Sequence, residues 1–367
     1  MKIPIFRTIE QNEYLMESIM KKIEDVFRTD AFVLGPVVEK FESKFAQIIG
    51  SKHAVGVGSG TDAFLLSLRL LDLQPESQVI IPVFGFVSIA MAVLRVGATP
   101  VFIDVDPLTG LMDLSKVEDA ITENTRAIMP VHLYGKAMNM NSLMEIARKH
   151  NLAVIEDCTQ AAGAQFHGRK LGTYGITGCF SFSPNSNLGG IGDGGMVITE
   201  VDEYAVRLRK FRDHGHADEI YHDEIGYNSR LDAIQAAVLT LKLEDLEDSN
   251  AERIENARFY NERFGDLNAV LPEITDNISH VFNLYTIQVA QRDAMNIYLK
   301  EKKVGCGIYY PIPLHMQPCF DFLGYKEGDF PQAEQLSKRV ISLPVFPGLK
   351  RQEIQYVTQS VRDFLSS

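Results

Sequence analysis

Short, continuously apolar runs alternate with helix-like segments through the first two-thirds of this chain. Four of them are expected to form strands: "SQVIIPV", "TPVFIDV", "TRAIMPVHL" and "LAVIEDC". Such runs are typical of strands that are covered on both faces, as in parallel sheets. Helices are expected between them, near 87–95, 113–121 and 141–149. This order predicts an α/β fold with a mainly parallel sheet flanked by helices.

Two more strands, "CFSFS" and "GGMVITE", are spaced closely enough to form a hairpin. After them, a helix that begins near Leu231 places Ile234, Val238 and Leu241 on one face. The polar stretch "EDLEDSNAERIENARFYNERF" is interpreted as a solvated connecting helix.

The pattern after this helix indicates a smaller α+β unit, with "HVFNLYTIQV" as one of its strands. The predicted division is a large domain over 1–250, which includes an N-terminal arm, and a small C-terminal domain over 251–367.

Composition excludes several classes of function. No run of about 18 apolar residues is present, so no membrane span is expected. The N-terminus lacks an apolar segment of the signal-peptide type, which predicts a cytoplasmic protein. The four cysteines have no metal-binding or disulfide-framework spacing, so reduced thiols and no metal site are expected. A net charge of −12 argues against binding to nucleic acid, although a local pocket for a small phosphorylated ligand is compatible with it.

The segment "GVGSGTDAF" (56–64) joins a strand end to a helix that starts near Thr61. Free backbone N–H groups and the helix dipole favour an anion at such a point. A plain glycine turn with Thr61 as helix cap explains the same letters.

Asp157, in "VIEDCTQAAGA", follows a predicted buried parallel strand. Ligands of open α/β sheets bind outside the carboxyl ends of the strands, where a carboxylate can hold a protonated ring nitrogen. The alternative is that Asp157 caps a following helix.

Two other segments have a functional and a structural interpretation. "PVFGFVSIA" puts Phe84 and Phe86 at another strand end, where an aromatic ring either stacks on a flat cofactor or packs in the core. "GYNSRLDAIQAA" puts Asn228 and Arg230 before an apolar helix, where capping and surface polarity also explain them.

Taken together and in order, these segments resemble the DegT-type sugar aminotransferases, which are fold-type I pyridoxal-phosphate (PLP) enzymes. The resemblance covers nearly the whole chain, from "FVLGPVVEKFESKFA" through "IMPVHLYG", "FSFSP" and "NLGGIGDGG" to "YYPIPLHMQP" and "AEQLSKRVISLPVFPGL". It implies a homodimer with shared active sites.

The resemblance also implies a role for individual residues. Gly60, Thr61 and Ser181 match positions that bind the cofactor phosphate. Phe86 matches the aromatic residue stacked on the pyridine ring, and Asp157 matches the aspartate that keeps the ring nitrogen protonated. The two remaining matches are a residue at the ring's phenolic oxygen and an asparagine that reaches the neighbouring subunit's cofactor phosphate: Gln160 and Asn228.

Ser186 departs from the family pattern. The family turn reads like "FSF-x-P-x-K-N-L-G", and its lysine forms the Schiff base with PLP. Here the following Asn187, Leu188 and Gly189 stay in register, so Ser186 stands at the lysine position and no insertion hides a displaced lysine. Lys170 belongs to a different element. A serine hydroxyl cannot form an imine and is a poor base without a partner, so slow or absent transamination is expected, with PLP or pyridoxamine phosphate (PMP) bound non-covalently.

Three functions remain open at this point. The first is transamination of a nucleotide-linked keto-sugar, with L-glutamate as amino donor, in polysaccharide or glycosylated-metabolite biosynthesis. The second is a PMP-dependent keto-sugar dehydratase, a class in which histidine replaces the lysine. The third is a non-catalytic binding partner of an active paralogue. Tyr309 and His315, in "YYPIPLH", are expected to shape the sugar pocket, with simple packing as the alternative for His315.

Overall fold

The computed structural model describes residues 1–7, 13, 15–29, 31–216, 220–275 and 278–366. Its strands are β1 (His53–Val57), β2 (Gln78–Pro82), β3 (Thr99–Ile103), β4 (Thr125–Ile128), β5 (Ala153–Asp157), β6 (Gln165–Phe166), β7 (Arg169–Lys170), β8 (Thr177–Ser181), β9 (Gly195–Thr199), β10 (Tyr285–Gln288) and β11 (Val340–Leu343). Its α-helices are α2 (Met16–Thr29), α3 (Pro36–Ile49), α4 (Gly60–Arg69), α5 (Ser88–Arg95), α6 (Met140–Lys149), α7 (Asp202–Arg212), α8 (Ala233–Lys242), α9 (Leu246–Phe264), α10 (Arg292–Glu301), α11 (Pro331–Arg339) and α12 (Arg351–Leu365).

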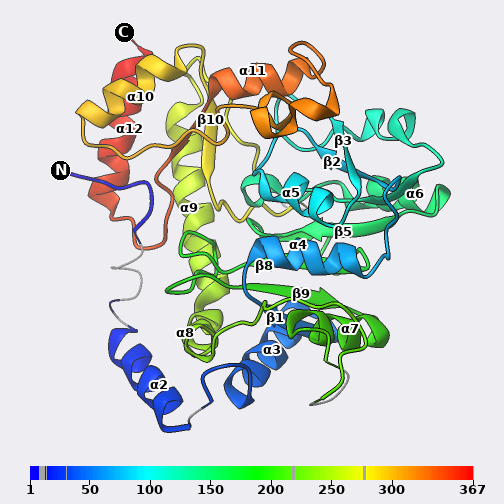
Figure 1. Ribbon diagram of the computed structural model, residues 1–367. Coiled ribbons are helices and arrows are strands. Elements are labelled where there is room, and N and C mark those ends of the chain that lie inside the picture. Colours follow the sequence, from blue (N-terminus) through cyan, green and yellow to red (C-terminus); the bar gives the residue numbers. More distant parts are fainter. Residues whose placement is uncertain (8–12, 14, 30, 217–219, 276–277, 367) are drawn as a thin grey trace.

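Seven strands form the central sheet, in the order β1-β9-β8-β5-β4-β2-β3 (Figure 1). All four pairings among β8, β5, β4, β2 and β3 are parallel, and β9 runs antiparallel to both of its neighbours. The predicted α/β fold with a mainly parallel sheet is therefore confirmed. The continuous apolar runs explain it, because β2 and β5 are buried over nearly their whole length.

β8 and β9 are adjacent and antiparallel, with Ser181 opposite Gly195. They do not form a tight hairpin, because the loop 182–194 joins them. This loop contains Ser186. Because the loop follows the carboxyl end of β8, Ser186 lies beside the ends of the parallel strands.

Two local predictions were wrong. The helix expected over 113–121 is a pair of 3-10 turns, because only Val117 of that segment is buried and no continuous apolar face exists. The helix expected from about Leu231 is present as α8, in which Val238 is buried and Ile234 and Leu241 are half-buried. This helix packs against both α2 and α3, so its buried face is wider and includes several alanines.

The helix α9 is not simply solvated, which is the second correction. It buries residues at a helical repeat along one face: Leu246, Asn250, Arg253, Ala257, Tyr260 and Phe264. Two of these are polar, which hides the apolar stripe in the sequence. Figure 1 shows α9 running beside the sheet, between α8 and the region of α12.

Two hydrophobic clusters fill the molecule. The larger one surrounds the central sheet, and the smaller one lies among α9, α10, α12 and the two-stranded sheet β10-β11. Ile3 joins the smaller cluster, whereas Leu314 and Leu336 join the larger one. The division into 1–250 and 251–367 stays a prediction.

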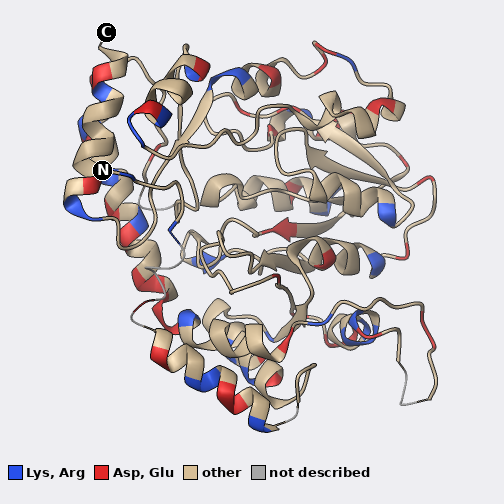
Figure 2. Ribbon diagram, turned by 60° about the vertical axis from the view of Figure 1, so that its left-hand side comes forward, with Lys and Arg blue, Asp and Glu red and all other residues tan. Residues whose placement is uncertain are grey.

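Charged residues of both signs are interspersed over the helices in the view of Figure 2. Among the described residues, no helix combines the length and apolar character needed to cross a membrane.

Candidate functional site

A cavity of about 370 Å³ opens beside the start of α4 and the loop after β8. We call it the cofactor cavity. Of the residues singled out in the sequence, it is lined by Gly60, Thr61, Phe86, Gln160, Ser181, Ser186 and Tyr309. These residues come from separate segments, and the parallel strands bring them to one edge of the sheet.

One end of this cavity is the N-terminus of α4. Ser59, rather than Thr61, is the cap residue, and its hydroxyl accepts a hydrogen bond from Asp62 N at 3.1 Å. The amides of the first helical positions, Gly60 and Thr61, have no acceptor within the helix and are available to an anion. A Cβ on Gly60 would lie only 2.8 Å from the Cβ of Ser181, so glycine lets the helix start approach the Ser181 hydroxyl.

Asp157 ends β5 and is buried. Its Oδ1 accepts hydrogen bonds from Thr159 N (2.9 Å) and Thr159 Oγ1 (2.6 Å). Asp157 therefore caps a turn, and no helix follows it directly. Within the described part of the chain, no hydrogen bond reaches Oδ2, which leaves it available to a ring N–H. Burial raises the pKa of Asp157, and Thr159 and His132 oppose that shift, so a nearby cation would stabilise the ionised form.

Aromatic side chains form one wall. Phe84 is buried in the core, whereas Phe86 is 58% exposed and lines the cavity. The ring centroid of Phe86 lies 6.2 Å from that of Tyr310. Gln160 bridges this wall to the sheet, since Nε2 donates to the Tyr310 hydroxyl at 3.0 Å and Oε1 accepts from Tyr134 N at 2.6 Å.

Ser186 lies half-buried in the cavity wall. Its backbone N–H donates to Ser183 O at 2.8 Å. Neighbouring amides hold the loop, because Asn187 Nδ2 donates to Asn250 Oδ1 (2.7 Å) and Asn283 Nδ2 donates to Asn185 O (3.1 Å). No lysine is among the described residues that line the cofactor cavity.

Several residues considered in the sequence as site candidates lie outside this lining: Phe84, Asp157, Lys170, Asn228, Arg230 and His315. Lys170 donates to Gly163 O and Glu247 instead. Buried His315 pairs with Glu334 at 3.0 Å, which agrees with the packing alternative. Asn228 is exposed and does not line the cavity of its own chain.

Some lining residues were not singled out from the sequence. Ser59 was not singled out because Thr61 was considered as the helix cap, and Asp193 lies in the quoted "NLGGIGDGG" run. Asn283 lies inside a segment that was interpreted as a strand, and no sequence signal pointed to it.

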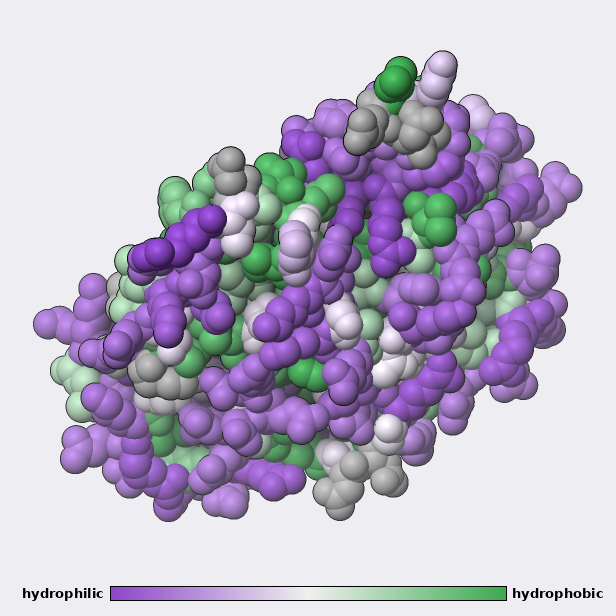
Figure 3. Space-filling model, turned by 90° about the horizontal axis from the view of Figure 1, so that it is seen from below, coloured by the Kyte–Doolittle hydropathy of each residue, from purple (hydrophilic) through white to green (hydrophobic). Residues whose placement is uncertain are grey.

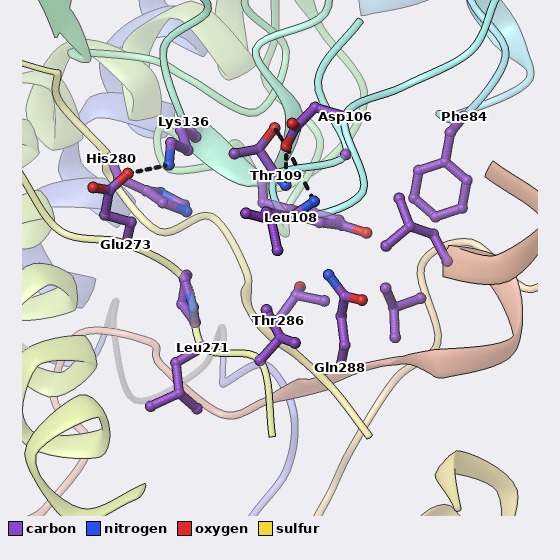
Figure 4. A pocket seen from close by; sticks show the side chains of 16 residues that line it. Phe84, Asp106, Leu108, Thr109, Lys136, Leu271, Glu273, His280, Thr286 and Gln288 are labelled. Carbon is purple, nitrogen blue, oxygen red and sulfur yellow. Dashed lines mark hydrogen bonds and ion pairs between the residues drawn. The ribbon is translucent and has the colours of Figure 1, made fainter. Parts of the chain in front are cut away.

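A second cavity, of about 390 Å³, lies behind Phe84 and Tyr134. Figure 4 shows Lys136 directed at Glu273 (3.5 Å) and the Asp106 carboxylate receiving the Thr109 hydroxyl (2.8 Å). Lys136 and Glu273 pair with each other and Asp106 is held by Thr109, so these charged side chains are already engaged.

His132, Glu156 and Cys158 form a buried cluster with metal-ligand chemistry. The Glu156 carboxylate accepts hydrogen bonds from His132 Nε2 and from three backbone N–H groups, those of Gly172, Tyr174 and Gly175. The cluster is explained as an anchor for the 172–175 turn.

Comparison with known proteins agrees with this geometry. The model of the DegT/DnrJ/EryC1/StrS aminotransferase family matches residues 13–362. A UDP-N-acetyl-3-dehydro-alpha-D-glucosamine 3-aminotransferase of Acidithiobacillus ferrooxidans is 43% identical and covers 95% of this chain and 94% of its own. A pleiotropic regulatory protein of Geobacillus stearothermophilus is also 43% identical, over 99% of both chains.

Solved structures are similar over the whole chain. The crystal structure of S. venezuelae DesV in complex with a ketimine intermediate superposes with a TM-score of 0.97 at 37% identity, covering 100% of this chain and 99% of DesV. The NtdA structure from Bacillus subtilis, with bound cofactor PMP, superposes with a TM-score of 0.93 at 30% identity, covering 100% and 86%.

Proposed function

Because the chain belongs to the DegT/DnrJ/EryC1/StrS aminotransferase family, we propose that it binds PLP or PMP non-covalently in the cofactor cavity. Its substrate class is a nucleotide-linked keto-sugar, with L-glutamate as amino donor. Its transamination is impaired or abolished, because Ser186 stands where the family has lysine. One observation carries this proposal: a lining that suits a phosphate and a flat ring contains Ser186 and, among the described residues, no lysine. Asp157 lies behind this lining, hydrogen-bonded to the lining residue Thr159.

The residues divide the work as follows. The Gly60 and Thr61 amides and the Ser181 hydroxyl hold the phosphate, and Phe86 covers the ring. Asp157 accepts the hydrogen bond of the ring nitrogen. When bound, the cofactor supplies a reactive carbon and a ring that accepts electrons from the substrate carbon. Ser186 neither forms a covalent bond to that carbon nor moves a proton efficiently at neutral pH, since its hydroxyl has no basic partner among the described residues.

The nucleotide-sugar assignment is supported by what related proteins act on. One relative at 43% identity is named for a UDP-linked amino sugar, and two others are named for dTDP-linked sugars. The dehydratase is the weaker candidate, because no histidine lines the cofactor cavity in the described chain.

The phosphate site is tested by removing one hydroxyl. Ser181→Ala is expected to weaken PMP binding about 10- to 100-fold, the cost of losing a hydrogen bond to a charged group. Pyridoxamine, which lacks the phosphate, is expected to lose at most about twofold in the same variant. Binding is measured by equilibrium dialysis. Thr109→Ala, which removes a hydroxyl from the second cavity, serves as the control. An equal loss for both ligands would contradict the assignment.

A shared-site dimer explains why Asn228 lies exposed and outside its own cavity. The molecule also exposes apolar side chains near its N-terminal helix, among them Met20 (57%), Phe27 (62%) and Val33 (49%). Figure 3 shows the molecule from below, the side on which α2 lies in Figure 1, and apolar patches appear there between polar ones. Such patches are typical of an interface.

Mixing two chains tests this dimer. The unaltered protein has Asn228 but lacks the lysine. A Ser186→Lys, Asn228→Asp double variant has the lysine but lacks Asn228. Neither chain alone is expected to transfer the amino group, because an aspartate repels the partner's cofactor phosphate. Refolded mixtures are expected to be active through one complete site in each hybrid dimer. A single-chain mass near 41.1 kDa in light scattering, or an inactive mixture beside active Ser186→Lys dimers, would contradict the shared site.

A further inference from the structure

A third cavity shares a wall with the cofactor cavity at Ser186. Its volume is about 530 Å³, within the range of small-molecule sites. Besides Ser186 and Asn187, it is lined by Lys242 at the end of α8, by Arg253 on α9 and by the 347–350 segment. We call it the cationic cavity.

Two cations in this cavity lack acidic partners. Lys242 Nζ donates to Gly189 O at 2.5 Å, and Arg253 Nη1 donates to Phe282 O at 3.3 Å. Arg253 is only 3% exposed, and its Nε is buried without any hydrogen-bond partner. Among the described residues, no carboxylate forms an ion pair with either side chain.

The pKa values of Lys242 and Arg253 are consistent with the lack of an acidic ion-pair partner. Burial lowers the pKa of Lys242 to about 8, and the neighbouring charge of Arg253 adds to this shift. Burial also lowers the pKa of Arg253 to about 10, although Glu252 opposes the shift. Both cations are therefore less stable in the empty cavity than in water, and a bound anion would offset that cost.

The acidic residues that line the cavity do not neutralise this pair. Asp248 and Glu252 are exposed at its mouth, and Glu252 accepts a hydrogen bond from Gly348 N at 2.8 Å. The charge of Arg7 is already paired with Glu353. The remaining charged residues of the lining are Glu13, Asp245 and Lys350.

The side-chain oxygen of Asn187 lacks a hydrogen-bond donor. Its Nδ2 donates to Asn250 Oδ1 at 2.7 Å and to Val281 O at 3.0 Å, which fixes the orientation of the amide. Its Oδ1 is buried and accepts no hydrogen bond. Among the described residues, Lys242 and Arg253 thus have no carboxylate as an ion-pair partner, although the charge of Glu252 acts on Arg253, and Asn187 Oδ1 has no hydrogen-bond donor.

We propose that the cationic cavity binds the amino acid that donates the amino group, which rests on the transaminase ancestry proposed above. The carboxylate of the amino acid pairs with Lys242 and Arg253. Its ammonium group lies toward Asn187, at the wall shared with the cofactor cavity. The serine side chain is shorter than lysine, so Ser186 leaves the wall between the two cavities thin. The amine of the bound amino acid therefore lies next to the position that the lysine amine has in the family.

Calorimetric titration of cofactor-free protein with L-glutamate tests this proposal. Lys242→Gln removes the charge and keeps a donor for Gly189 O. It is expected to weaken L-glutamate binding about 10- to 100-fold. Lys44→Gln removes a surface charge that pairs with Glu244, and it is expected to change the affinity less than about twofold. Arg253→Lys, which keeps the charge but loses the fork of donors, provides a second variant if Lys242→Gln fails to fold.

Glutarate and inorganic phosphate distinguish an amino acid site from a general anion site. L-glutamate is expected to bind more tightly than either, because only it supplies the ammonium group. Absent L-glutamate binding, unchanged binding in Lys242→Gln, or equal affinity for glutarate or phosphate would overturn the proposal. PMP binding is measured on the same preparation. Protein that binds PMP but not L-glutamate refutes the cationic-cavity inference and leaves the proposed function standing.

Discussion

Replacing Ser186 by lysine is expected to raise the rate of amino transfer from L-glutamate to PLP by at least about 10²-fold. A positioned acid–base group alone contributes about 10²- to 10⁴-fold in rate, and the lysine amine also holds the cofactor covalently. The gain is expected because the surrounding site is in place. Ser186 lies half-buried in the wall of the cofactor cavity, and hydrogen bonds from Asn187 and Asn283 hold its loop.

Stopped-flow absorbance of the PLP-to-PMP conversion measures this rate. Ser183→Lys is the matched control, because Ser183 also lines the cofactor cavity. It places the same amine three positions earlier in the loop, where no gain is expected. An equal gain in both variants would show that position 186 has no special geometry. No gain in Ser186→Lys, with PLP still bound, would favour the non-catalytic partner over a lost transaminase.

Asp157→Asn is expected to separate stability from cofactor binding. Asn retains an oxygen for the Thr159 hydrogen bonds but removes a buried charge. The cofactor-free variant should therefore be at least as resistant to urea as the parent. PMP affinity should fall about 10- to 100-fold, because the charge-assisted bond to the ring nitrogen is lost. Asp202→Asn, at an exposed aspartate on α7, is the control and should leave the PMP affinity unchanged.

The same carboxylate predicts a pH dependence. Burial raises the pKa of Asp157 above the ordinary aspartate value, so in the cofactor-free protein this group costs stability as the pH rises through that range. Cofactor binding needs the ionised form. PMP affinity should therefore decline on acidification at a pH above the ordinary aspartate range, and the decline should be absent in Asp157→Asn. The same decline in both proteins would assign it to another group.

The sequence predicted the sheet and the residues at its edge well, for a physical reason. Strands buried on both faces must be apolar throughout, so β2 and β5 are visible as continuous runs. Parallel strands end at one edge, so residues after separate runs, such as Phe86 and Gln160, were expected to meet, and they do line one cavity.

Other features were not readable in the sequence because polar residues occupy buried positions. Asn250 and Arg253 interrupt the apolar stripe of α9, so the helix looked solvated and its cavity was not anticipated. Phe84 and Phe86 are two residues apart, yet one is buried and the other is 58% exposed, which depends on tertiary packing. His315 shares a segment with Tyr309 but turns toward Glu334, for the same reason.

The most direct test of the central claim is borohydride reduction in the presence of PLP, followed by intact mass measurement. The protein with Ser186 is expected to gain no pyridoxyl group, whereas Ser186→Lys is expected to gain one, and peptide mapping should locate it at position 186. A covalent pyridoxyl group on the unaltered protein would show that another lysine serves the site, and it would contradict both the assignment of Ser186 and the non-covalent binding inferred from it.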